Sequence, residues 1–153
     1  MVSTPTKTAA KTSGQKMTGA LDSPWAARLE REQQHQTKKE AVLLSAARLF
    51  TRKGFQGTSL DDIAQSLGVT KPTLYYYIDN KEQILFECVE RELALFRSGL
   101  QALEAQGLQG RDRLRAAMQL YASVVTGDFG LCVSRVGEDP LSEARRHELR
   151  KLK

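Results

Sequence analysis

Apolar residues recur at helical spacing along most of this 153-residue sequence. In the clearest case, Val42, Ala46, Leu49 and Phe50 stand at positions i, i+4, i+7 and i+8, which places them on one face of a helix. No segment alternates apolar and polar residues with the two-residue period of a strand. The sequence therefore predicts an all-α fold, and its 41% hydrophobic content is enough to bury a core.

Capping residues mark the ends of the first two predicted helices. The first helix is expected over residues 36–53, where Gly54 supplies the residue that ends it. The second is expected over residues 59–67. We expect Thr58 to be its N-cap, with Asp61 three residues later as a carboxylate variant of the capping box.

The third and fourth helices carry similar signals. Thr70 is the expected N-cap of a short helix that ends near residue 78, with Pro72 in the first turn, where a missing N–H is tolerated. Asn80 is the expected N-cap of a much longer helix, with Gln83 returning the capping contact. The apolar stripe of this long helix comprises Leu85, Val89, Leu93, Phe96, Leu100 and Leu103.

The last part of the chain predicts two more helices. One is expected over residues 111–125, and its predicted buried residues are Leu114, Met118, Tyr121 and Val125. Residues 126–137 are expected to form a loop or a short helix. Asp139 and Pro140 resemble an N-cap and first-turn pair, so they predict a final helix that runs to the end of the sequence.

Two short helices joined by a tight turn at Gly68 indicate a helix-turn-helix, with Ile63, Val69 and Leu74 as the apolar residues that fix the crossing. The second of these helices carries three consecutive tyrosines, at residues 75–77. Successive helical positions are rotated by about 100°, so the three rings cannot all face one core. At least one ring must therefore point outward.

A larger set of residues carries a family resemblance. It comprises Leu49-Phe50, Gly54-Phe55, Thr58-Ser59-Leu60, Asp62-Ile63-Ala64, the run from Gly68 to Tyr77, and Asn80-Lys81-Glu82. This set resembles the DNA-binding domain of TetR/AcrR-family transcriptional regulators. The resemblance covers about a third of the chain, and Ile78 replaces the phenylalanine that is usual in the family.

The resemblance implies a set of DNA-contacting residues. Those that correspond to base- and phosphate-contacting positions of the recognition helix are Lys71, Pro72, Thr73, Tyr75, Tyr76 and Tyr77. Thr58 and Lys81 correspond to residues that clamp phosphates. For Tyr76, packing beneath the recognition helix is an equal alternative to contact with DNA.

The resemblance also implies the domain organisation. We expect a basic arm, disordered or partly helical, over residues 1–35, a DNA-binding domain over residues 36–81, and the start of a helical ligand-binding and dimerisation domain over residues 82–153. Because the sequence stops within its last predicted helix, where family members continue, we expect either a truncated product or a different mode of dimerisation. Candidate residues of an effector pocket, with core packing as the alternative role, are Phe96, Leu100, Met118 and Tyr121.

Charge and composition restrict the remaining function classes. The net charge is +5, and its surplus lies within residues 1–81, which suits a polyanionic partner. Cys88 and Cys132 are expected to be buried, reduced thiols. The sequence has no metal-ligand cluster, catalytic nucleophile with a base, phosphate-binding loop or membrane-spanning apolar run. We therefore expect a cytoplasmic protein that is not an enzyme and needs no metal or cofactor.

These observations predict a sequence-specific repressor. Two copies of the chain would bind a palindromic operator in double-stranded DNA, and a small apolar effector would release them. The alternative is an architectural DNA-binding module without a regulatory role. Selectivity separates the two, because a repressor prefers its operator to random DNA by roughly 10³-fold or more.

Overall fold

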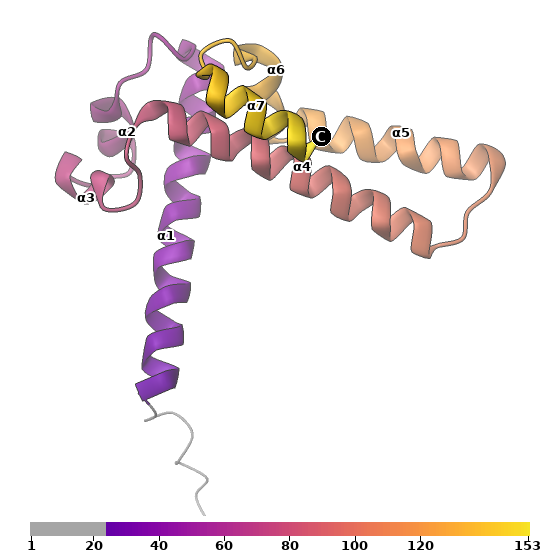
Figure 1. Ribbon diagram of the computed structural model, residues 1–153, viewed down its shortest axis with the longest axis horizontal. Coiled ribbons are helices and arrows are strands. Elements are labelled where there is room, and N and C mark those ends of the chain that lie inside the picture. Colours follow the sequence, from indigo (N-terminus) through magenta and orange to yellow (C-terminus); the bar gives the residue numbers. More distant parts are fainter. Residues whose placement is uncertain (1–23) are drawn as a thin grey trace, which may run out of the picture. The chain divides into compact units, whose positions relative to one another are not determined.

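The computed structural model describes residues 24–153 and contains only helices there, which confirms the predicted all-α class (Figure 1). The helices are α1 (Pro24–Lys53), α2 (Leu60–Ser66), α3 (Lys71–Tyr75), α4 (Lys81–Ala105), α5 (Gly110–Thr126), α6 (Asp128–Val136) and α7 (Glu143–Leu152). No single helix among them is long and apolar enough to cross a membrane, although α5 and α6 together, as a bent pair, meet that test of length and composition.

The chain divides into two compact units, Met1–Gln34 and His35–Lys153. Within the described part of the first unit, an ion pair of 2.8 Å joins Arg28 Nε to Glu32 Oε1, one turn apart on α1. The second unit contains the remainder of α1 and all the other helices. The segments expected as a DNA-binding domain and as a C-terminal domain thus pack together in one unit.

One apolar core joins all the helices of the second unit except α5. It is built mainly from α1 and from the first turns of α4. Its largest fully buried side chains are Phe50, Leu43, Ile63, Leu74, Ile78, Ile84, Leu85 and Leu149. α4 supplies a run of buried residues directly after its N-terminus. It therefore joins the core formed with α1 to the C-terminal helices α5, α6 and α7, which pack on it.

Four polar contacts fix the helices around this core. Lys39 and Glu40 of α1 pair with Glu87 and Arg91 of α4, at 2.8 and 2.9 Å. The guanidinium of Arg48 donates two hydrogen bonds to the Asp128 carboxylate on α6, at 2.9 and 3.0 Å, and holds the pKa of that carboxyl below its ordinary value. At the start of α7, the backbone N–H of Ser142 donates to Glu82 Oε1 on α4 at 2.8 Å.

The corner between α5 and α6 requires a glycine at Gly130. The two helices meet at an angle of 74°, and Gly127 is both the C-cap of α5 and the N-cap of α6. Gly130, which is buried, packs so closely on the end of α5 that an added Cβ would lie 2.1 Å from the carbonyl oxygen of Val124. The short helix that was one alternative for residues 126–137 is therefore confirmed, and its close backbone contact is the feature that the sequence did not reveal.

The starts of α1 and α7 differ from the sequence expectations. α1 begins at Pro24, well before residue 36, because residues 24–35 contain good helix formers and a proline in the first turn. α7 begins at Glu143, with the Ser142 side chain as its N-cap, so the Asp139–Pro140 start was wrong. Leu141, which is 2% exposed, follows that pair in a turn, and its burial delays the helix.

The outward face of α5 contradicts the expected burial. Leu114, Met118 and Tyr121 are 62%, 64% and 61% exposed, and α5 has no fully buried residue. Its opposite face packs on α4, where the Leu120 side chain lies against Gly99. Helical spacing correctly located an apolar stripe, but spacing alone cannot say which of two apolar faces is covered.

The two cysteines are buried, as expected. Cys88 on α4 and Cys132 on α6 are both fully enclosed in the core, and Cys88 Sγ lies 4.0 Å from the carbonyl oxygen of Leu43. A hydrogen bond with the Cys132 thiol, together with burial, raises the pKa of Cys88. The Cys88 thiol is therefore kept protonated, and both thiols are out of contact with solvent.

Candidate nucleic-acid interface

The helices α2 and α3 form the predicted helix-turn-helix. Gly68, in the turn, has a φ of +65°, a backbone conformation that L side chains rarely adopt. Ile63 and Leu74 are both fully buried and fix the crossing of the two helices, as predicted. Val69 is 38% exposed and so contributes less to the crossing than expected.

The short helix α3 presents almost everything except Leu74 to solvent. Its N-cap is Thr70, as predicted, whose Oγ1 accepts a hydrogen bond from the backbone N–H of Thr73 at 3.4 Å. The Thr70 and Thr73 hydroxyls also share a hydrogen bond of 2.8 Å. Lys71, Pro72 and Thr73 are all exposed. The first turn of α3 thus offers one cation and two hydroxyls on a single accessible surface.

The three tyrosines divide as the helical rotation predicted. Tyr75 and Tyr76 are 47% and 73% exposed, whereas Tyr77 is half-buried and packs against the core. Of the two alternatives for Tyr76, packing beneath the recognition helix is thereby wrong. α3 itself ends at Tyr75, earlier than expected, and Tyr76 is its C-cap.

The Lys71 ammonium is held within the helix-turn-helix. Its Nζ lies 2.8 Å from Asp61 Oδ2 on α2, and this hydrogen bond and charge raise the pKa of Lys71. Both side chains are largely exposed, at 44% and 67%, so water and salt screen the pair. Lys71 can therefore exchange this carboxylate for a phosphate or a base at little cost.

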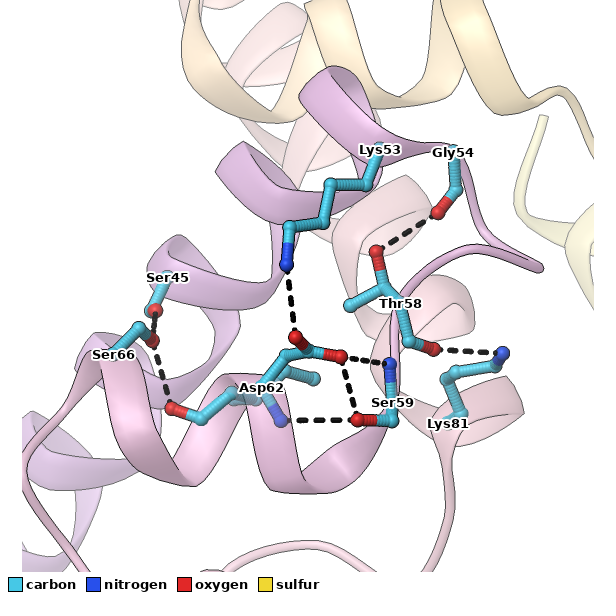
Figure 2. A network of polar contacts seen from close by, with 9 residues as sticks. Ser45, Lys53, Gly54, Thr58, Ser59, Asp62, Ser66 and Lys81 are labelled. Atoms are coloured by element: carbon cyan, nitrogen blue, oxygen red, sulfur yellow. Dashed lines mark hydrogen bonds and ion pairs between the residues drawn. The ribbon is translucent and has the colours of Figure 1, made fainter.

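A polar network encloses residues 54–59, which we call the α1–α2 turn (Figure 2). Ser59 is the N-cap of α2, and its Oγ accepts a hydrogen bond from the backbone N–H of Asp62 at 3.0 Å. One carboxylate oxygen of Asp62 accepts from the Ser59 backbone N–H at 2.8 Å, and the other is 2.8 Å from Lys53 Nζ. The turn is thus tied at once to the end of α1 and the start of α2.

Thr58 occupies a different place from the one expected. It is 1% exposed, and its hydroxyl donates to the carbonyl oxygen of Gly54 at 2.8 Å. The N-cap assignment to Thr58 and Asp61 was therefore wrong by one residue, because burial of the Thr58 side chain leaves Ser59 to cap the helix. A buried hydroxyl that is already bonded is also unable to clamp a phosphate, so the Thr58 hydroxyl stabilises the turn instead.

Lys81 closes the α1–α2 turn from the side of α4. Its Nζ donates to the carbonyl oxygens of Phe55 and Thr58, at 2.7 and 3.0 Å, and lies 4.3 Å from the centre of the Phe55 ring. Two of its three ammonium protons are therefore used inside the protein. A phosphate contact through the third proton stays a prediction.

The Asp62 network makes stability depend on pH. Hydrogen bonds from Lys53 and Ser59 hold the pKa of Asp62 well below its ordinary value of 3.8. A carboxyl whose pKa is lowered by folding stabilises the protein above about pH 4, and this stabilisation is lost as pH falls toward the folded pKa. We therefore expect Asp62→Asn to have a lower melting temperature than the parent at pH 7, with a difference that shrinks steadily below about pH 4.

Thermal melts followed by circular dichroism from pH 7 down to about pH 2.5 measure this difference. Asp139→Asn is the matched control, since Asp139 is exposed in the loop before α7, and it should change the melting temperature less at neutral pH. A difference between parent and Asp62→Asn that stays constant down to the lowest pH would mean that the ionised Asp62 does not hold the turn.

The four candidate effector-pocket residues do not all come together. A cavity of about 160 Å³ lies between α4 and α5, and Phe96 and Tyr121 line it with ring centres 6.5 Å apart. Leu100 and Met118 do not line it; they are 37% and 64% exposed. Among residues 24–153, no group of three or more His, Cys, Asp or Glu side chains could hold a metal ion.

Comparison with known proteins finds a family that one segment of this chain resembles. Residues 42–88 match the model of the tetR family of bacterial regulatory proteins. Over these residues the chain is similar to that family. The matched residues run from the apolar stripe of α1 to the buried first turns of α4, and so include the whole helix-turn-helix and the α1–α2 turn.

Individual proteins are similar to this chain over different lengths. The biofilm operon negative transcriptional regulator IcaR of Staphylococcus epidermidis is 46% identical over 52 residues, which are 34% of this chain and 28% of IcaR. The crystal structure of PfmR from Thermus thermophilus is 33% identical with a TM-score of 0.61, over 72% of this chain and 61% of PfmR. AibR, in complex with isovaleryl coenzyme A and operator DNA, is 30% identical with a TM-score of 0.63, over 74% of this chain and 63% of AibR.

The chain therefore spans less than a third of the curated relatives it matches and about three fifths of the solved structures. The similarity to IcaR is confined to 52 residues, close to the length of the segment 42–88 that matches the family model. The structural similarity covers 72% of the chain and so extends into the C-terminal helices.

Proposed function

We propose that this chain is a sequence-specific DNA-binding repressor that places α3 in the major groove of a palindromic operator. The observation that carries the proposal is the division of α3 into one fully buried residue, Leu74, and an exposed surface of Lys71, Pro72, Thr73 and Tyr75. Amines, hydroxyls and phenol rings are the groups that contact phosphates and base edges. Similarity to IcaR, a negative regulator, and to AibR, which binds operator DNA, supports the same function.

Binding as a homodimer and release by a small apolar molecule complete the proposal. Two α3 helices about 34–36 Å apart would enter successive major grooves. The same helix, α4, begins at Lys81 beside the α1–α2 turn and passes the cavity at Phe96. An effector that prefers a wider cavity would therefore shift α4, and through Lys81 the helix-turn-helix.

The experiment begins with selection of a duplex from a random-sequence library, followed by measurement of its Kd and of the oligomeric state by sedimentation velocity. Preference for the selected duplex over scrambled DNA by roughly 10³-fold or more supports a repressor, whereas equal affinity would indicate an architectural binder. Release of the selected duplex by members of a panel of small apolar acids and acyl-coenzyme A esters tests the effector step.

Lys71→Ala tests the assignment of α3. We expect it to weaken binding to the selected duplex by about 5- to 150-fold and to relax the base preference, because it removes the cation from the first turn of α3. Lys151→Ala, which removes an equal charge from an exposed position on α7, should leave the Kd within about twofold. Equal effects of the two substitutions would mean that Lys71 contributes only net charge.

A further inference from the structure

We propose that His35 of α1 is a positioning residue for DNA recognition, which orients the Tyr76 ring before DNA is bound. The proposal rests on the proposed function, since it concerns the surface that α3 and Tyr76 would present to the operator. His35 is half-buried, whereas its contact Tyr76 is 73% exposed. A residue on a different helix thus holds one of the most exposed rings of the candidate interface.

His35, Tyr76 and Tyr77 form a cluster of three rings, in which each ring packs against the other two. The ring centres of His35 and Tyr76 are 5.4 Å apart, with an edge-to-face angle of 72°. Those of His35 and Tyr77 are 5.0 Å apart at 40°, and those of Tyr76 and Tyr77 are 5.1 Å apart at 88°. All three separations lie in the range in which aromatic pairs attract each other.

The three rings differ in how firmly the fold holds them. Tyr77 packs against the core and, with Lys38, Ala41 and Val42 of α1, lines a groove between α1 and α3. Tyr76 does not pack against the core, because it is the C-cap of α3 and points into solvent. His35 and Tyr77 therefore form a two-sided support for Tyr76.

An unsupported exposed ring samples several rotamers and loses this freedom when it binds. A ring that already stands in one orientation loses less, so its contacts with DNA contribute more to affinity. The strength of a single aromatic contact corresponds to about two- to tenfold in an equilibrium constant, and this sets the expected size of the effect.

His35 has no place in the family signature. It lies on α1 before the residues 42–88 that match the family model. A second explanation is that His35 only stabilises the fold. The two explanations differ in whether the effect of His35 on DNA affinity depends on the Tyr76 ring. A positioning role requires that ring, whereas a purely structural contribution would be the same with or without it.

A double-mutant cycle with the selected duplex makes this separation. We expect His35→Ala to raise the Kd by about two- to tenfold, and His35→Phe, which keeps a ring, to restore it to within about twofold. Gln36→Ala, at an exposed neighbouring position of α1, is the matched control and should have no effect. In a Tyr76→Ala background, His35→Ala should cause no further loss. An equal loss in both backgrounds would overturn the proposal.

A measurement without DNA keeps this test separate from the proposed function. In the free protein carrying ring-labelled tyrosine, the NMR signals of Tyr76 should shift in His35→Ala and return toward their original positions in His35→Phe. Unchanged Tyr76 signals in His35→Ala would overturn the positioning role, whatever the DNA result. If the parent chain selects no duplex at all, the proposed function fails, while the ring signals still decide whether His35 positions Tyr76.

Discussion

Leu74→Ala is expected to lower the free energy of unfolding by about 2–5 kcal/mol, the range for removing most of a fully buried leucine side chain. Leu74 is 0% exposed and is the one buried residue of α3, which is only five residues long. A helix this short has too few internal hydrogen bonds to persist without packing. The cavity should therefore loosen α3 as a whole and weaken DNA binding together with stability.

Urea unfolding followed by circular dichroism measures the loss, and Leu95→Ala is the matched control. Leu95, on α4, is 54% exposed, so the same truncation there should change stability by roughly 0.5 kcal/mol or less. If the two variants unfold at the same urea concentration, Leu74 does not anchor α3 and the packing described for the helix-turn-helix is wrong.

Gly130→Ala is expected to lower the free energy of unfolding by about 1–3 kcal/mol or more, because the added methyl group meets backbone atoms instead of a movable side chain. A Cβ at this position would lie 2.1 Å from the carbonyl oxygen of Val124 and 2.7 Å from the Cα of Val125. The end of α5 and the start of α6 would have to separate, which would disturb the Arg48–Asp128 contact on the first turn of α6.

Gly99→Ala provides the control for this second substitution. Gly99 also lies within a helix, and a Cβ there would meet the Cδ1 atom of Leu120 at 2.2 Å, but a leucine side chain can rotate away. The gain in helix propensity, about 0.5–1 kcal/mol, offsets this adjustment. We therefore expect the free energy of unfolding of Gly99→Ala to stay close to that of the parent. A loss at Gly99 as large as that at Gly130 would show that the backbone contact is not the cause.

Sequence reasoning located the helix-turn-helix because its signals are local. The N-caps Thr70 and Asn80 and the glycine at residue 68 act within one turn of the chain, so their roles can be inferred from neighbouring residues alone. The N-cap of α2 was missed by one position. Both Thr58–Asp61 and Ser59–Asp62 fit the spacing of a capping box, and only burial of Thr58 decides between them.

Contacts between distant residues were beyond the reach of the sequence. Lys81 was expected on a phosphate, yet two carbonyl oxygens from the α1–α2 turn accept its hydrogen bonds. The contact between His35 on α1 and Tyr76 at the end of α3 joins residues that are far apart in the sequence. Neither pairing follows from periodicity or composition, because each depends on how the helices cross.

The buried thiols of Cys88 and Cys132 give the protein an internal reporter of its own motion. They lie on α4 and α6 within the shared core, so a reagent can reach them only when the helices around them open. The rate at which a thiol reagent labels the native protein should therefore report openings of this core, as amide exchange reports openings of a hydrogen bond. Such labelling would follow the movement of α4 in unmodified protein, with no engineered dye.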